Sequence, residues 1–224
     1  LYVVLVDGMM ISIDGPVATG KSVVGRLLAK RLGYKFLDTG IMYRAITWLA
    51  MKNDVCIGDW ASLTTLTNRT VIFIDYETGQ IYLDGLLVPL SEERDTIDKN
   101  VSRVSEVPGV RKVLTQYQQD IGRQGSIVMV GRDIGTIVLP DASVKFFLTA
   151  SDKERVRRRY IELKTGGFNI KEEEVFRVMS ERDRLDSERT HSPLMPAKDA
   201  HIVNTDGLNI EEVVDSITLI IGEE

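Results

Sequence analysis

The most constraining feature of this sequence is a glycine-rich loop between a short apolar run and a helical pattern. Residues 15–22 read Gly-Pro-Val-Ala-Thr-Gly-Lys-Ser, which fits the pattern G-x-x-x-x-G-K-[ST]. The apolar residues 11–14 predict a strand before the loop, and the spacing of apolar residues over 24–32 predicts a helix after it. Such a loop wraps backbone N–H groups around phosphate oxygens, and the helix adds the positive end of its dipole. The sequence therefore predicts a site for the phosphates of a nucleoside triphosphate.

Two side chains of this loop add chemistry to its backbone contacts. Lys21 provides a point charge for the transferred phosphate, and the hydroxyl of Ser22 is a ligand that Mg²⁺ accepts. We therefore expect Mg²⁺ to bind together with the nucleotide. The alternative interpretation, a chance loop with an unrelated lysine, would make the correct flanking strand and helix a coincidence. The residues expected at the triphosphate are Gly15, Pro16, Val17, Ala18, Thr19, Gly20, Lys21 and Ser22.

Short apolar runs alternate with helical patterns along the chain. This alternation predicts an α/β fold in which helices wrap a parallel sheet. Further strands of that sheet are expected at residues 36–37, 127–130, 144–148 and 201–204. Residues 71–76 and 80–85 alternate with period 2 around Glu77-Thr78-Gly79, which predicts an antiparallel hairpin inserted into the scaffold. A length of 224 residues fits a single domain carrying this insertion.

The composition excludes several classes of protein. Apolar residues make up 43% of the chain, which is enough for a sizeable core and excludes disorder throughout. With 33 acidic and 28 basic residues the net charge is −5, which argues against nucleic-acid binding. No apolar run reaches the roughly 18 residues of a spanning helix, so we expect no membrane partner. The single cysteine, Cys56, cannot form an intramolecular disulfide, which favours the reducing cytoplasm.

The first ten residues, LYVVLVDGMM, are apolar but lack the basic segment of a signal peptide. We expect residues 1–8 to be either an additional strand or an upstream extension without a role. The pattern does not distinguish between the two.

Arginines are concentrated at predicted strand ends, loops and helices. A triphosphate-binding loop alone fits GTPases, ATPase motors and small kinases. The chain lacks the Asn-Lys-x-Asp signature of guanine recognition and is short for a motor, which disfavours those two classes. Phosphoryl transfer to a second phosphate brings two polyanions together, and fixed positive charge offsets their repulsion. The arginines concerned are Arg44, Arg111, Arg132, Arg155, Arg157, Arg158, Arg159, Arg182 and Arg189.

Three short segments follow the phosphate loop, at residues 38–44 (DTGIMYR), 131–136 (GRDIGT) and 181–189 (ERDRLDSER). In this order they resemble the signatures of bacterial-type cytidylate kinases, and the resemblance extends from about residue 11 to the C-terminus. One departure is Ala18, where many relatives have glycine. The resemblance implies a P-loop kinase that transfers the γ-phosphoryl group of ATP to CMP or dCMP. It also implies an acceptor-binding insertion at about residues 40–110 and a lid at about residues 152–168.

The resemblance further implies roles for residues around the acceptor nucleotide. Arg44, Arg132 and Arg182 would bind its phosphate, because guanidinium groups match phosphate oxygens in pairs. The other implied positions are Thr39 at the nucleotide, Asp186 and Arg189 at the ribose, and Ser102, Arg111 and Asp133 at the cytosine ring.

Spacing alone favours plainer roles for several of these residues. Ser102 and Arg111 are typical of exposed helix positions, and Thr39 is typical of a helix N-cap. Asp133 follows an apolar strand, where a carboxylate can organise Mg²⁺ through water. The charged residues of 182–189 share a helix face if the helix reaches that far, which is also typical of an exposed salt bridge.

Four arginines mark the expected lid. Arg155, Arg158 and Arg159 fall on one helix face, with Arg157 adjacent. Closing over ATP, such a lid would exclude water and bring guanidinium groups to the phosphates, with Arg155 and Arg158 binding ATP. We expect the cations to repel one another until phosphate arrives. The alternative is a basic helix face neutralised by acids of the same helix, which are Asp152, Glu154 and Glu162.

The expected catalytic residues are Lys21, Arg132, Arg158 and Arg182. The expected partners are ATP and CMP or dCMP, bound by a monomer. The acceptor phosphate is already largely ionised at neutral pH, so no general base is needed. Two alternatives stay open: another small kinase that acts on UMP, AMP or an alcohol, and a regulatory module that senses ATP and needs no second arginine cluster.

Overall fold

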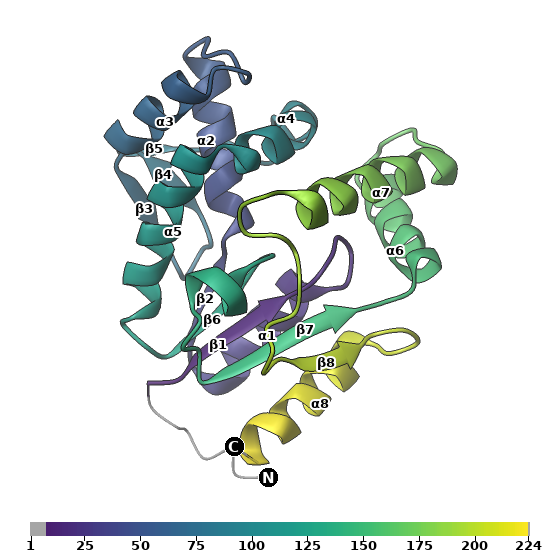
Figure 1. Ribbon diagram of the computed structural model, residues 1–224. Coiled ribbons are helices and arrows are strands. Elements are labelled where there is room, and N and C mark those ends of the chain that lie inside the picture. The colour runs from purple at the N-terminus through teal and green to yellow at the C-terminus, as the bar shows by residue number, and fades with distance from the viewer. Residues whose placement is uncertain (1–7, 224) are drawn as a thin grey trace.

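The centre of the molecule is a five-stranded parallel sheet, seen in a computed structural model that describes residues 8–223. The strands lie in the order β2-β6-β1-β7-β8, and each pair of neighbours is parallel. They are β1 (Met10–Asp14), β2 (Lys35–Asp38), β6 (Ile127–Val130), β7 (Val144–Thr149) and β8 (His201–Asn204). Because all strands run in one direction, their carboxyl ends meet at one edge of the sheet, which is where such sheets bind ligands (Figure 1).

Both faces of this sheet are buried, as its apolar strands predict. In β6, Ile127 and Met129 belong to one hydrophobic cluster, whereas Val128 and Val130 belong to another. The first cluster includes side chains of α5 (Pro108–Gly122), and the second includes side chains of α1 (Lys21–Leu32) and α8 (Ile210–Glu223). The glycine-rich loop connects β1 to α1, so the buried sheet fixes the loop from below.

Between β2 and β6 the chain forms the inserted part of the molecule. It consists of α2 (Gly40–Lys52), α3 (Trp60–Arg69), β3 (Ile72–Ile74), β4 (Ile81–Leu83), β5 (Leu86–Leu87), α4 (Arg94–Glu106) and α5. The predicted hairpin is confirmed, since Ile72 pairs with Leu83 and Ile74 with Ile81 in an antiparallel register. α3 and β5 have no counterpart in the sequence-based expectations. Figure 1 shows this insertion standing to one side of the carboxyl edge.

After β7 the chain forms α6 (Asp152–Thr165) and α7 (Glu172–Glu188), which pack together through Val156, Val175 and Met179. Figure 1 shows this pair of helices across from the insertion, with α7 reaching towards α4. The charged residues over 171–184 predict a helix there, and the structure extends it to Glu188. Because α7 continues to Glu188, it carries both Arg182 and Asp186, and Arg189 follows directly.

The predicted fold class is confirmed: helices cover a parallel sheet, and a small antiparallel sheet lies in the insertion. The two interpretations of residues 1–8 fall outside the described residues, except for Gly8, which lies in a turn. Within residues 8–223, no helix is both long and apolar enough to cross a membrane.

Candidate active site

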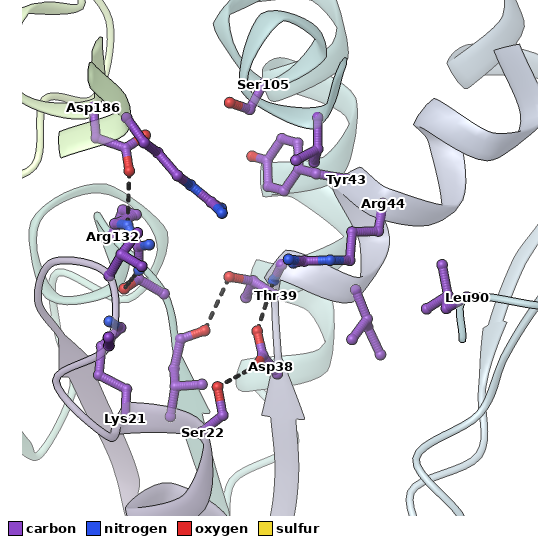
Figure 2. A pocket seen from close by; sticks show the side chains of 18 of the residues that line it. Lys21, Ser22, Asp38, Thr39, Tyr43, Arg44, Leu90, Ser105, Arg132 and Asp186 are labelled. Carbon is purple, nitrogen blue, oxygen red and sulfur yellow. Dashed lines mark hydrogen bonds and ion pairs between the residues drawn. The ribbon is translucent and has the colours of Figure 1, made fainter. Parts of the chain in front are cut away.

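A cavity of about 590 Å³ opens at the carboxyl edge of the sheet, between the glycine-rich loop, α2, α4 and α7. Figure 2 shows Lys21 and Ser22 on its loop side, with Tyr43 and Arg44 of α2 on the opposite wall. Most of the predicted site residues line it, namely Val17, Ala18, Gly20, Lys21, Ser22, Thr39, Arg44, Arg111, Arg132, Asp133, Arg182, Asp186 and Arg189.

The loop depends on glycine where the backbone turns most sharply. Gly15 has a φ of 144°, and a Cβ atom there would lie 2.2 Å from the carbonyl oxygen of Leu148. Gly20, with a φ of 94°, leads the chain into α1. Ala18 also has a positive φ, of 61°. This left-handed backbone costs alanine more than it would cost glycine.

Lys21 lies beneath this loop and is 7% exposed. Its Nζ donates to the carbonyl oxygen of Pro16 at 2.5 Å and to Oγ1 of Thr19 at 3.4 Å. Burial lowers the pKa of Lys21 well below its ordinary value, and the charge of Arg132 lowers it further. A phosphate in the cavity would favour the charged lysine, so this side chain is suited to bind one.

Ser22 faces a carboxylate that the sequence analysis did not assign. Its hydroxyl donates to Oδ2 of Asp38 at 2.5 Å, and Oδ1 of Asp38 accepts the N–H of Gly40 at 3.0 Å. A hydroxyl and a carboxylate are the oxygen donors that Mg²⁺ prefers, so this pair fits that ion. Thr39 does not cap α2 through its side chain; its hydroxyl donates to the carbonyl oxygen of Val130 at 3.0 Å.

Three arginines converge on the cavity from different elements. Arg132 follows β6, donates from Nε to Asp186 at 2.8 Å and also contacts the carbonyl oxygen of Gly15. Arg182 is half-buried on α7, and its buried Nε has no hydrogen-bond partner among the described residues. Burial, together with the charges of Arg132 and Arg44, lowers the pKa of Arg182 to about 10. Guanidinium groups that converge on one cavity form a site for an anion.

Arg111 and Asp133 form a buried ion pair at the other end of the cavity, 2.5 Å apart and each 5% exposed. Spacing alone would have made Arg111 a solvated residue, but it lies over the ring of Tyr43, 5.4 Å from the ring centre. The serine that lines the cavity on α4 is Ser105, whereas Ser102 is absent from the described lining residues. The two are linked, because the hydroxyl of Ser105 donates to the carbonyl oxygen of Ser102 at 2.7 Å.

Comparison with known proteins agrees with this geometry. A family model described as cytidylate kinase matches residues 11–223. The chain belongs to the cytidylate kinase family. A cytidylate kinase of Carboxydothermus hydrogenoformans is 46% identical over 218 residues, which cover 96% of this chain and 98% of that protein. A cytidylate kinase of Bacillus velezensis is 44% identical, with 96% and 97% covered.

A shikimate kinase structure from Bacteroides thetaiotaomicron shares the fold, with a TM-score of 0.51 at 13% identity and coverage of 95% and 98%. The resemblance inferred from the three sequence segments is confirmed by the family match.

The lid residues lie differently from the expectation for cytidylate kinases drawn above. Arg155 donates to the carbonyl oxygen of Val17 and pairs with Asp183, and Arg158 contacts Glu154 and Thr205. Within the described residues neither of these arginines lines the cavity, nor do Gly15, Pro16 and Thr19 of the loop; Arg159 does. The expected repulsion among the lid arginines was wrong, because each has an acidic partner. The neutralising acids include Asp152, Glu154 and Glu162, together with Asp98 and Asp183 from other helices.

Proposed function

We propose that this protein transfers the γ-phosphoryl group of ATP to CMP or dCMP, giving ADP and CDP or dCDP in pyrimidine nucleotide metabolism. The observation that carries the proposal is one cavity with two cationic groups, Lys21 of the loop and the cluster of Arg44, Arg132 and Arg182. A module that only senses ATP would need the loop alone. Two phosphate sites that face each other are what phosphoryl transfer between nucleotides requires.

In this mechanism the protein positions the two phosphates and neutralises their charge. The acceptor phosphate has a second pKa of about 6 and attacks as a dianion, so no residue needs to remove a proton. Lys21, Arg132 and Arg182 stabilise the charge on the transferring group. The proposed lid comprises about residues 152–168, and the proposed acceptor insertion comprises about residues 40–110. Arg155 and Arg158 bind ATP after α6 moves from the position described above. Arg158 then joins the catalytic groups.

The proposed cofactor is Mg²⁺ bound with ATP. Ser22 and Asp38 would hold it, directly or through water, and it would supply positive charge next to the phosphates. Asp38 also accepts the N–H of Gly40, which fixes its carboxylate towards Ser22.

The acceptor nucleoside is selected at the other end of the cavity. Cytosine presents an amino donor, which suits Asp133, and an acceptor at N3 or O2, which suits Arg111. Asp186 and Arg189 would contact the ribose. Thr39 and Ser102 complete the proposed acceptor site, with Ser105 as the serine nearer the cavity. We also propose that the enzyme acts as a cytoplasmic monomer without nucleic-acid or membrane partners.

The test of the proposal is Lys21→Ala, measured by ADP release in the presence of ATP, Mg²⁺ and CMP. Loss of this charge should lower kcat on the order of 10²- to 10³-fold while the protein stays folded, because the side chain acts on developing charge. Lys30→Ala is the matched control: it removes an exposed lysine from the same helix and should retain wild-type kcat. Wild-type kcat in Lys21→Ala would contradict the proposed function.

A further inference from the structure

Ion pairs connect α4 of the insertion directly to α6 of the proposed lid. Arg94 of α4 pairs with Glu162 of α6 at 2.5 Å, and Arg159 of α6 pairs with Asp98 of α4 at 3.2 Å. Glu162 also pairs with Arg159 at 2.9 Å within α6. The side chains therefore form a continuous cluster across the mouth of the cavity, which Arg94, Arg159 and Glu162 also line.

Asp98 is the member of this cluster that reaches the proposed acceptor site. Its Oδ1 accepts from Arg44 of α2 at 2.8 Å, and its Oδ2 accepts from Arg159 at 3.2 Å. Burial raises the pKa of Asp98, but the charges of Arg44 and Arg159 outweigh it and hold the pKa below its usual value. One carboxylate thus joins an acceptor-phosphate arginine to a lid arginine.

The other lid arginines are anchored elsewhere. Arg157 and Arg158 pair with Glu154 of their own helix, and Arg155 pairs with Asp152 of α6 and Asp183 of α7. Without Asp98, Arg44 would lose its ion-pair partner within the described residues, and Arg159 would keep only Glu162 of its own helix. The two cations, which line the same cavity, would then repel each other. Among the lid cations of the described chain, Arg159 is therefore the one whose position depends on the insertion.

We propose that Asp98 is a positioning residue that couples the acceptor site to the donor site. A phosphate bound to Arg44 fixes that side chain, hence Asp98, and through Asp98 holds the guanidinium of Arg159 at the cavity, which Arg159 lines. ATP then binds more tightly to protein that already holds CMP, and CMP binds more tightly in the presence of ATP by the same factor. This inference rests on the proposed function.

The test measures the Kd of a non-hydrolysable ATP analogue with Mg²⁺, with and without saturating CMP, by calorimetry. The coupling factor is the Kd of the analogue without CMP divided by its Kd with CMP. This factor should be about five or more in the wild-type protein and should fall towards one in Asp98→Asn. Binding of CMP alone is measured first. If CMP does not bind the wild-type protein, the proposed function fails; if CMP binds but the factor is one, only the coupling fails.

Two further variants make the test specific. Asp95→Asn removes the same charge from an exposed position on α4 that has no ion pair within residues 8–223, and it should keep the wild-type factor. Glu162→Gln breaks the pair with Arg94 at a side chain that is 50% exposed, so it carries little folding risk and should also lower the factor. The inference would be overturned if Asp98→Asn or Glu162→Gln kept the wild-type coupling factor. It would also be overturned if Asp95→Asn lowered the factor as much as Asp98→Asn does.

Discussion

At the scale of single residues, Arg111 and Asp133 form a buried ion pair, so each side chain is already oriented by the other at the proposed cytosine site. Uracil presents O4 to a carboxylate and N3–H to a guanidinium, and each mismatch costs about 1–3 kcal/mol. We therefore expect a ratio of kcat/KM for CMP over UMP on the order of 10² to 10⁴.

Asp133→Asn should narrow that ratio, because an amide can donate to O4 of uracil as well as accept from the amino group of cytosine. The measurement is kcat/KM for both acceptors. Urea unfolding of the variant and the wild type checks that the protein stays folded when Arg111 has a neutral partner. CMP use should fall more than UMP use. Equal falls would assign Asp133 to the phosphates or the metal ion instead.

Asp14 gives the protein a pH-dependent stability. It is 3% exposed at the end of β1 and accepts the N–H groups of Ile134 and Gly135. Burial raises its pKa from 3.8 to about 6 in spite of these hydrogen bonds. Because the folded-state pKa is above the unfolded one, the contribution to stability is complete below 3.8 and is lost as the pH rises through about 6.

Asp14→Asn cannot titrate, so the stability of the wild type relative to this variant should decrease by roughly 3 kcal/mol between about pH 4 and pH 7. Urea unfolding of both proteins at each pH measures this difference. A difference independent of pH would show that Asp14 titrates at its ordinary value in the folded protein.

The sequence predicts the location of residues that belong to a short motif. It does not predict contacts between elements that are far apart along the chain. Most of the loop and Arg44, Arg132, Arg182 and Arg189 of the three segments line one cavity, because each follows a strand or lies on or next to a helix at the same edge. Ser105 and Asp38 were not assigned, since helix phase and a cross-loop hydrogen bond do not appear in local spacing. The pairing of Arg159 with Asp98 joins residues 61 positions apart, which no local pattern indicates.

At the scale of elements, β6 and β8 agree with the sequence to the residue, because short apolar runs bounded by turns define buried strands. α3 was missed because its sequence, WASLTTLTNR, is rich in threonine. Two tertiary features sustain it: Asp59 accepts the N–H of Ser62 at the helix start, and the buried Leu63 belongs to the hydrophobic cluster that includes α5.

The packing of α1 on β6 should not tolerate a side chain at Gly25. A Cβ atom there would lie 2.5 Å from Cγ1 of Val130 and 3.0 Å from the ring of Phe36. Gly25→Ala should lower the free energy of unfolding by about 1–3 kcal/mol, although alanine favours a helix. Gly222→Ala in α8 meets no atom within 4 Å and should leave stability unchanged or slightly higher. Equal effects in urea unfolding would contradict this packing.

At the scale of the whole molecule, a rigid sheet carries the phosphate loop, and two helical parts attached to it face each other across the cavity. The ion pairs between α4 and α6 hold these parts together in the described state. The sequence predicted both parts but treated the lid arginines as mutually repelling. The acids that neutralise Arg155 and Arg159 lie partly on α7 and α4, so the contact between the parts decides their charge balance.

The most direct test of the account is the product formed from ATP and Mg²⁺ with each of CMP, dCMP, UMP and AMP. Chromatographic quantification of all nucleotides gives both the acceptor used and the stoichiometry. We predict one CDP or dCDP for each ADP formed, with UMP and AMP used far less efficiently. ADP formed without any acceptor, or UMP or AMP phosphorylated as efficiently as CMP, would contradict the assignment.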